Sequence, residues 1–263
     1  MIEKTYEIIQ GLKIIAKTLE VTSCYIGIEK NKRDAIRAMR EEIRNEANME
    51  VVPLKTKYPQ GSERQLIEAI LNREVPSGGL PLDVGVIVQN VGTALAISEA
   101  VKKGNPLIER VVTVTGKGIK NPANLRVRIG TLFQDVIDYC GGFRGKPGKM
   151  IMGGPLMGFS QYTTQVPVIK GTTGILVLPE EETEEIKERS CIRCNRCVDV
   201  CPMDISPNLI AKYASKDRFD WAREYGALDC MECGICAYVC PAKIPLVQLI
   251  KYAKAQITGI SRE

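Results

Sequence analysis

The spacing of hydrophobic residues predicts alternating helices and strands over the first hundred residues. Ile8, Leu12, Ile15 and Leu19 recur at helical spacing near the N-terminus, and short apolar runs between later helical patterns indicate buried strands. Such alternation predicts right-handed crossovers around a mostly parallel sheet. Because the order starts on a helix, this segment is expected to be the back part of an α/β domain. The expected elements are helix 3–20, strand 23–29, helix 32–47 capped by Asn31, strand 49–55, helix 63–73, strand 82–91 and helix 92–104 ending at Gly104.

The pattern changes after residue 106 to shorter, alternating segments. Two strands with a turn between them, a helix and two further strands predict a small β-grasp module. An acidic stretch after these strands is expected to be a linker to the last third of the chain. The expected elements are strands 109–116 and 124–130, helix 131–142 capped by Thr131 and ended by Gly141 and Gly142, and strands 166–171 and 174–179.

The last third is rich in cysteine and predicts only helices. Residues 206–229 indicate two short helices broken near Ser215 and Lys216. A final amphipathic helix over 245–257 places Leu246, Leu249, Ile250 and Ala253 on one face, which is expected to pack on the cysteine-bearing part. The predicted fold class is therefore multidomain, α/β plus α+β with a helical C-terminal domain. The expected domains are 1–106 (α/β part), 107–178 (β-grasp module), 179–190 (acidic linker) and 191–263 (tandem cluster domain).

Composition narrows the possible functions. The 263 residues include no histidine, which excludes every histidine-dependent triad and metal site within this chain. The net charge of +5 comes from scattered basic residues that are not interleaved with aromatics, so nucleic acid is not an expected partner. No apolar run reaches the length of a membrane span, and the first residues do not resemble a signal peptide. We therefore expect a cytoplasmic protein that can still dock on a membrane complex.

Eight of the ten cysteines form two similar cassettes, "CIRCNRCVDVCP" and "CMECGICAYVCP". The spacing C-x2-C-x2-C-x3-C-P is that of bacterial ferredoxins, in which the fourth cysteine binds the other cluster when two are present. Pro202 and Pro241 turn the chain after each fourth cysteine by preventing helical continuation. The spacing thus predicts two [4Fe-4S] clusters with exchanged ligands. The predicted sets are Cys191, Cys194, Cys197 and Cys240 for one cluster, and Cys230, Cys233, Cys236 and Cys201 for the other.

Structural zinc is the alternative for these cassettes. Zinc sites favour two CxxC pairs separated by a longer loop, whereas both copies here carry a third cysteine three residues after the second. Iron–sulfur clusters therefore fit the spacing better. The remaining cysteines, Cys24 and Cys140, stand alone in apolar segments and are expected to be ordinary core thiols.

The motifs together resemble the C subunit of Rnf-type complexes, which are membrane-bound, ion-translocating ferredoxin:NAD oxidoreductases. The resemblance covers nearly the whole chain, and its cluster cassettes are generic whereas the stretches before them are specific. It is carried by "KYPQGSERQLI", "LPLDVGVIVQNVGTA", "ERVVTVTG", "RIGT", "MIMGGPLMGF", "CIRCNRCVDVCPM" and "CAYVCPAKIPLVQLIKYAK".

The resemblance implies a partial flavin domain at the N-terminus. In that family the α/β domain is similar to the flavin-binding subunit of respiratory complex I, which accepts hydride from NADH onto FMN, and the β-grasp module is of the SLBB type. By this resemblance Gly61 and Glu63 occupy a glycine–glutamate loop, and Asn90 and Thr93 occupy an asparagine-rich loop near the flavin. Plain turns at the ends of parallel strands are the alternative for both loops.

One departure from the family bears on the flavin. Residues 1–60 contain no G-x-G-x-x-G or G-G-x-G-G run, the loop that holds flavin and nicotinamide phosphates in the family. We therefore expect FMN and NADH to bind only with a further N-terminal segment, whether the chain is a fragment or a natural short form. Whether the chain is itself an enzyme stays open at this point.

The expected function is electron transfer through two [4Fe-4S] clusters, between a flavin/NADH site and partner subunits of an Rnf-type complex. Its expected location is the cytoplasmic face of the cell membrane, as a peripheral subunit. Expected partners are the other subunits and ferredoxin-like electron carriers. One alternative is a soluble reductase component of the same wider family, associated with cobalamin or proline reduction. A zinc-stabilised scaffold without redox chemistry is another.

Overall fold

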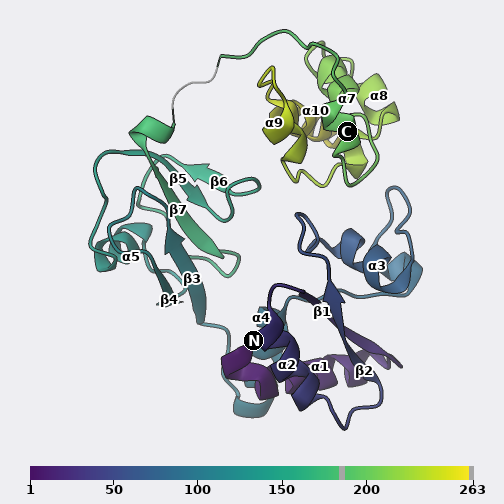
Figure 1. Ribbon diagram of the computed structural model, residues 1–263, viewed down its shortest axis with the longest axis vertical. Coiled ribbons are helices and arrows are strands. Elements are labelled where there is room, and N and C mark those ends of the chain that lie inside the picture. Colours follow the sequence, from purple (N-terminus) through teal and green to yellow (C-terminus); the bar gives the residue numbers. More distant parts are fainter. Residues whose placement is uncertain (184–186, 261–263) are drawn as a thin grey trace. The chain divides into compact units, whose positions relative to one another are not determined.

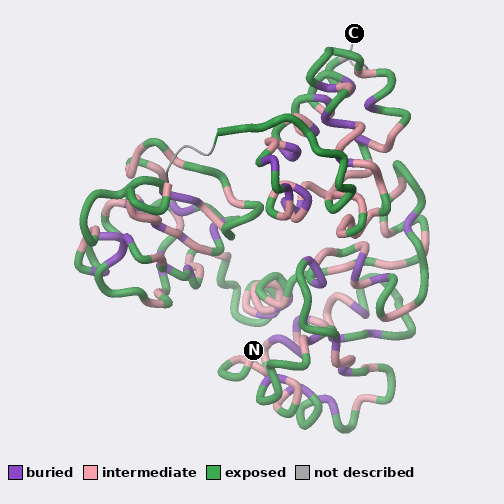
Figure 2. Tube along the Cα trace, turned by 45° about the horizontal axis from the view of Figure 1, so that its top comes forward, coloured by how far each residue is buried: buried purple, intermediate pink, exposed green. Residues whose placement is uncertain are grey.

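The structure is a computed structural model that describes residues 1–183 and 187–260. The chain divides into two compact units, Met1–Leu107 and Ile108–Glu263. Buried residues gather in separate cores rather than in one continuous core (Figure 2). The division of the second unit into a module, a linker and a cluster domain stays a prediction.

The first unit contains a short parallel sheet covered by helices (Figure 1). β1 and β2 pair in parallel, from Cys24 opposite Met49 to Glu29 opposite Leu54, and α2 makes the crossover between them. Helices α1 and α4 pack along each other, and their apolar faces join the strands in one core around Ile9 and Met39. The elements are α1 (Thr5–Leu19), β1 (Cys24–Glu29), α2 (Arg33–Glu42), β2 (Met49–Leu54), α3 (Glu63–Leu71) and α4 (Val91–Lys103), with 3-10 turns at Ile2–Lys4 and Pro81–Val84.

Gly11 lets α1 approach α4 closely. A Cβ atom built on Gly11 would overlap the backbone carbonyl of Ala94 in α4. We predict that Gly11→Ala destabilises the chain by about 1–3 kcal/mol, because overlap with backbone cannot be relieved by a rotamer change. Denaturant unfolding of the first unit's signals measures the effect.

A second helical glycine provides the control for this substitution. Gly259 lies in the last helix with no atom within 4 Å of its added Cβ, so Gly259→Ala is expected to be neutral or to stabilise by roughly 0.5–1 kcal/mol through helix propensity. Equal stability of the two variants would show that the α1–α4 approach does not require glycine.

The second unit begins with a five-stranded mixed sheet in the order β4-β3-β7-β5-β6. β3 pairs antiparallel with β4 and parallel with β7, and β5 pairs antiparallel with β7 and β6. Helix α5 adds Phe133 and Ile137 to the core of this sheet, where both are fully buried. The elements are β3 (Glu109–Thr115), β4 (Ala123–Arg128), α5 (Phe133–Tyr139), β5 (Pro147–Met152), β6 (Phe159–Gln161) and β7 (Gly174–Pro179), followed by a 3-10 turn at Glu180–Glu182.

The rest of the second unit is helical and carries the cysteines. The face of α10 predicted from its spacing packs as expected, with Leu246, Ile250 and Ala253 buried. The predicted break between two short helices also forms, and α7 and α8 lie on either side of it. The elements are α6 (Arg196–Asp199), α7 (Pro207–Ala214), α8 (Phe219–Glu224), a 3-10 turn at Ala227–Asp229, α9 (Ile235–Val239) and α10 (Leu246–Ile260).

Two predicted strands are wrong. Residues 82–91 begin in a 3-10 turn, closed by Gly85 in the left-handed region and by the Asp83 side chain accepting from Leu80 N–H, so no ladder forms. In 166–171 the only bridge joins Pro167 to Leu132. Phe133 N–H donates to the Val166 carbonyl and Val168 N–H to the Thr131 carbonyl on either side of it. The pairing does not continue as a ladder, because Thr131 N–H donates to the Arg128 carbonyl instead of to Val168.

Other local predictions also need correction. Asn31 does not cap α2, which begins after Lys32. In the first turn of this helix, Ala35 N–H donates instead to the Asp34 carboxylate. Thr131 does not cap α5, because its carbonyl accepts from Val168 N–H and the helix starts one residue after Leu132. Strands β5 and β6 lie between residues 142 and 166, where the sequence predicted no element. Of the predicted linker 179–190, residues 184–186 lie outside the described residues.

Candidate functional site

The two cysteine cassettes share left-handed backbone conformations at equivalent positions. In the first, Arg193 and Asn195 have left-handed φ angles of 56° and 58°. In the second, Glu232 and Gly234 occupy the matching positions with φ angles of 59° and 84°. Non-glycine residues rarely adopt left-handed φ angles. Their occurrence at equivalent positions of both cassettes indicates that the two loops must meet the same geometric requirement.

Backbone amides point at sulfur in the same way in both copies. Arg193 N–H donates to Cys191 Sγ at 3.4 Å, and Glu232 N–H donates to Cys230 Sγ at 3.4 Å. Hydrogen bonds to sulfur stabilise thiolate ligands and tune cluster potentials. Motif matching missed these left-handed positions, although aligning the two cassettes with each other would have drawn attention to them.

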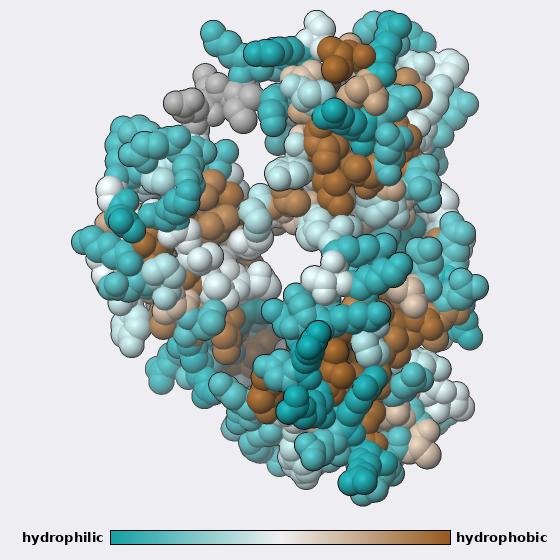
Figure 3. Space-filling model, viewed as in Figure 1, coloured by the Kyte–Doolittle hydropathy of each residue, from teal (hydrophilic) through white to brown (hydrophobic). Residues whose placement is uncertain are grey.

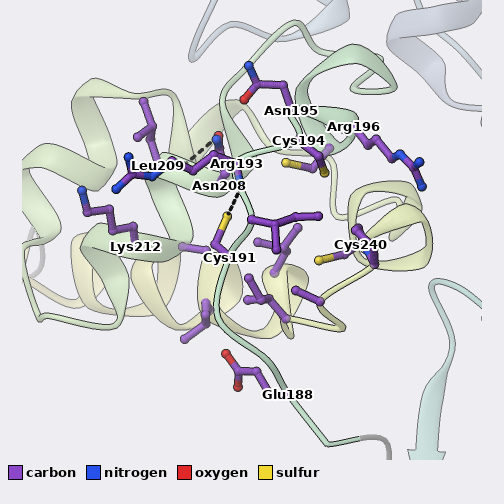
Figure 4. Close-up of a pocket in the computed structure, with 18 of the residues that line it drawn as sticks. Glu188, Cys191, Arg193, Cys194, Asn195, Arg196, Asn208, Leu209, Lys212 and Cys240 are labelled. Atoms are coloured by element: carbon purple, nitrogen blue, oxygen red, sulfur yellow. Dashed lines mark hydrogen bonds between the residues drawn. The ribbon is translucent and has the colours of Figure 1, made fainter.

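Four cysteines line a cavity in the helical region. Cys191, Cys194 and Cys197 of the first cassette and Cys240 of the second line a cavity of about 650 Å³. Figure 4 shows Cys191, Cys194 and Cys240 around this space, with α7 on one side. Cys191 and Cys194 are exposed, whereas Cys240 is buried.

The other four cysteines line a second, narrower pocket. Cys230, Cys233 and Cys236 meet Cys201 there, among apolar side chains such as Met203. The enclosed space among these residues is narrow, about 10 Å³. Cys233 and Cys236 are 7% and 8% exposed, which makes this the more enclosed of the two sites.

The structure thus brings the eight cysteines together in the two groups that the spacing predicts. Each group joins three cysteines of one cassette to the fourth of the other. In the described residues, no three or more acidic or cysteine side chains converge closely enough to hold a single metal ion. Four thiols on a repeated loop, with amides directed at sulfur, have the donor chemistry that a [4Fe-4S] cluster uses.

Burial affects the thiols of the narrow pocket most. It raises the pKa of Cys236 to about 12, and it raises the pKa of Cys230 and Cys233 above the ordinary thiol value as well. Cys197 in the larger cavity also has a raised pKa, again chiefly through burial. These thiols are protonated at neutral pH in the metal-free chain, so binding iron must release protons.

The raised pKa of Cys236 predicts alkaline sensitivity of the metal-free chain. The folded pKa of about 12 exceeds the ordinary 9.0, so the buried thiol stabilises the fold fully below pH 9. That contribution is lost as the pH rises from 9 toward 12, because the unfolded chain ionises first. Urea unfolding across this range should show a weaker pH dependence in Cys236→Ala than in wild type. Cys191→Ala, at an exposed thiol, is the control, and equal pH dependence in all three proteins would contradict the prediction.

A partly buried ion pair ties the second cassette to α10. Lys254 Nζ lies 2.7 Å from Glu232 Oε1 and donates to the Cys230 carbonyl at 2.9 Å. Lys251 Nζ lies 3.5 Å from the other carboxylate oxygen of Glu232. The helix therefore holds in place the one charged residue between Cys230 and Cys240.

The four residues expected near a flavin lie at the starts of two helices. Gly61 and Glu63 are exposed at the N-terminus of α3, where a Cβ on Gly61 would meet no atom within 4 Å. Asn90 caps α4 by accepting from Gly92 N–H at 2.8 Å, and Thr93 is exposed in the same turn. None of the four lines either cysteine cavity. Their role toward a flavin stays a prediction.

The two isolated cysteines are core thiols, as predicted. Cys24 is 6% exposed in β1 and Cys140 is 1% exposed at the end of α5. Burial raises the pKa of both thiols, which makes them poor nucleophiles.

Three family models match the chain in sequence order. They are described as the Nuo51 FMN-binding domain, at residues 1–99, the SLBB domain, at residues 111–160, and the 4Fe-4S dicluster domain, at residues 183–241. This order confirms the predicted fold class of an α/β segment, a β-grasp module and a ferredoxin-type domain. Within residues 1–183 and 187–260, every helix is too short or too polar to cross a bilayer.

A solved structure with low sequence identity shares the fold. A chain of the NAD+-reducing [NiFe]-hydrogenase in the H2-reduced state aligns with a TM-score of 0.59 at 13% identity, over 97% of this chain and 50% of that chain.

Curated relatives are much closer in sequence. The C subunit of the proton-translocating ferredoxin:NAD(+) oxidoreductase complex of Clostridium ljungdahlii is 50% identical over 87% of this chain. The C subunit of the Na(+)-translocating complex of Acetobacterium woodii is 48% identical over 87% of this chain. The alignments cover 50% and 52% of those relatives, so the chain spans about half their length. The chain therefore belongs to the family of the C subunits of ion-translocating, Rnf-type ferredoxin:NAD(+) oxidoreductase complexes.

Proposed function

We propose that this chain relays electrons through two [4Fe-4S] clusters within an Rnf-type complex. The observation that carries the proposal is the sorting of eight thiols into two adjoining sets, each completed by the other cassette. When bound, such clusters accept and pass on single electrons. Because each cassette supplies a ligand to both sets, the two sites are held side by side by the backbone itself.

The protein itself holds the thiolates, directs hydrogen bonds at them and shields them from water. The left-handed turns direct the amides of Arg193 and Glu232 at sulfur. Apolar residues of the narrow pocket, including Met203, Ile205 and Val247, exclude water from one site. The larger cavity opens to solvent at Cys191 and Cys194. One site is therefore enclosed and the other is accessible to a partner.

Electron uptake tests the relay. Anaerobically reconstituted chain, titrated with dithionite, is expected to bleach as it takes up about two electrons, one for each cluster. Zinc-loaded chain serves as the reference, because zinc has no redox chemistry. A colourless preparation that binds zinc in preference to iron and takes up no electrons would refute the relay and favour a scaffold.

For the flavin we propose that the first unit contributes two loops, at Gly61–Glu63 and Asn90–Thr93, to an FMN site that accepts hydride from NADH. The match to the FMN-binding family model supports this assignment. We predict that residues 1–263 alone do not reduce an artificial acceptor with NADH, even with added FMN. Robust activity would show that a glycine-rich loop is dispensable. In a preparation that binds FMN, Glu63→Gln should lower FMN occupancy while leaving the iron content unchanged.

We further propose that the chain's partners are the other subunits of such a complex and ferredoxin-like carriers, on the cytoplasmic face of the cell membrane. The names of the curated relatives support an assembly of this kind. Co-purification of the chain with membranes of its source cell, and its release by high salt, would support peripheral attachment. Purely soluble recovery at low salt would favour a soluble reductase component.

A further inference from the structure

The two cysteine sites differ in their access to solvent. Cys191 and Cys194 are exposed, and Ile192 between them leaves 68% of its surface in solvent. In the narrow pocket, Cys233 and Cys236 are buried. Because electron transfer slows steeply with distance, a protein partner reaches the first site at closer range than the second.

Three cations stand around the opening of the accessible site. Arg193, Arg196 and Lys212, here called the basic rim, line the same cavity as Cys191. Figure 4 shows Arg196 extending away from the sulfurs on one side and Lys212 on α7 on the other. None of the ion pairs between described residues uses a member of the basic rim.

Acidic residues near the opening are fewer. Glu188 lines the cavity, and Asp199 is exposed at the end of α6. The lining itself thus carries three cations and one anion. The excess is smaller at the second cassette, where Glu232 pairs with both Lys251 and Lys254.

An exposed apolar residue inside a ring of charge suits brief docking. Ile192 offers a small apolar contact at the lining of the same cavity. The cysteine-rich part also shows an apolar area bordered by hydrophilic residues (Figure 3). Weak electron-transfer interfaces are small, and complementary charge speeds their formation more than it tightens them. The charge of the rim selects an acidic partner.

We propose that the basic rim and Ile192 form the docking surface for an acidic protein that carries its own redox centre. The proposal rests on the proposed relay function. One electron passes from the reduced partner to the cluster site of Cys191, Cys194, Cys197 and Cys240; the partner is oxidised by one electron, and no bond forms or breaks. The electron then passes from this site to the site in the narrow pocket, inside the protein.

Charge reversal on the rim tests this surface. The reconstituted full chain is mixed in stopped flow with a reduced, strongly acidic plant-type ferredoxin. The wild-type second-order rate constant is expected to fall about tenfold or more as salt rises from about 20 mM to about 500 mM. Arg193→Glu/Arg196→Glu should be at least about tenfold slower than wild type at low salt and should lose most of the salt dependence.

The matched control is Lys120→Glu/Arg126→Glu, which changes the charge equally at exposed positions of the β-grasp module. It should keep the wild-type rate. Because Arg193 and Arg196 lie between ligands, Lys212→Glu outside the cassette provides an independent test and should be slower by about threefold. Calorimetric binding of oxidised ferredoxin should weaken in the same order as the rates.

The outcomes separate this surface from the relay itself. Failure of the wild-type chain to accept electrons from dithionite would reject the relay and the docking surface together. Normal electron uptake, with rim variants and control indistinguishable, would reject the docking surface alone. Rim-dependent sedimentation with anionic lipid vesicles, without ferredoxin binding, would also overturn it and assign the rim to the membrane.

Discussion

The double variant Cys201→Ala/Cys233→Ala is expected to retain about four iron atoms per chain, half the content of two four-iron clusters. Both cysteines line the narrow pocket, although they belong to different cassettes. Removing them together therefore damages one site and leaves the larger cavity with all of its thiols. Iron and sulfide analysis of the anaerobically reconstituted protein measures the result.

The companion variant distinguishes exchanged ligands from self-contained cassettes. Cys201→Ala/Cys194→Ala removes one thiol from each site, so both sites should be impaired and iron should fall well below four atoms per chain. If each cassette held its own cluster, Cys201→Ala/Cys194→Ala would retain more iron than Cys201→Ala/Cys233→Ala, because Cys194 and Cys201 share a cassette. Cys140→Ala, at a buried core thiol, should leave the iron content unchanged.

Removing the iron by anaerobic chelation is expected to loosen the cassettes and lower the thermal transition of the second unit by roughly 10 °C or more, through loss of a few kcal/mol of stability. Arg193, Asn195 and Glu232 hold left-handed conformations that cost free energy, which metal–thiolate bonds would offset. The α7–α8–α10 core around Ile210 and Ile250 lies outside the cassettes and should remain partly protected.

Hydrogen exchange locates the change. Amide protection should fall in 191–204 and 230–243, while the first unit keeps the protection it has with iron bound. Unchanged exchange in both cassettes after complete iron removal would show that the protein fold alone maintains these turns.

The cysteine groups could be proposed from the sequence because covalent spacing limits which thiols can meet. A three-residue interval and a following proline, such as Cys197 to Cys201 and Pro202, restrict the local geometry without reference to the rest of the chain. The amphipathic face of α10 was equally predictable, because the spacing of its apolar residues depends only on the helix itself.

Strand pairing was less predictable because it depends on distant partners. Residues 82–91 have the apolar composition of a buried strand, yet the turn at Pro81–Val84 and Gly85 removes them from any ladder. Residues 166–171 form only a single bridge, because Thr131 N–H donates to the Arg128 carbonyl instead of pairing with Val168. Helix starts were misplaced by one or two residues at Asn31 and Thr131, where neighbouring backbone contacts decide the cap.

The basic rim could not be recognised from the cassettes alone. Arg193 and Arg196 are visible in the motif, but Lys212 joins them only through the folding of α7 against the same cavity. The neutralisation of Glu232 by Lys254 likewise requires α10 to lie beside the second cassette. Charge asymmetry between the two sites is a property of the tertiary structure.

Low-temperature EPR of the dithionite-reduced, reconstituted wild-type chain tests the central claim most directly. Two neighbouring [4Fe-4S] clusters with exchanged ligands predict a signal that integrates to about two spins per chain and is broadened by interaction between them. Cys201→Ala/Cys233→Ala should leave about one spin with a simple, unbroadened signal. A wild-type spectrum of about one spin, or of two spins without interaction, would contradict two adjacent clusters sharing their cassettes.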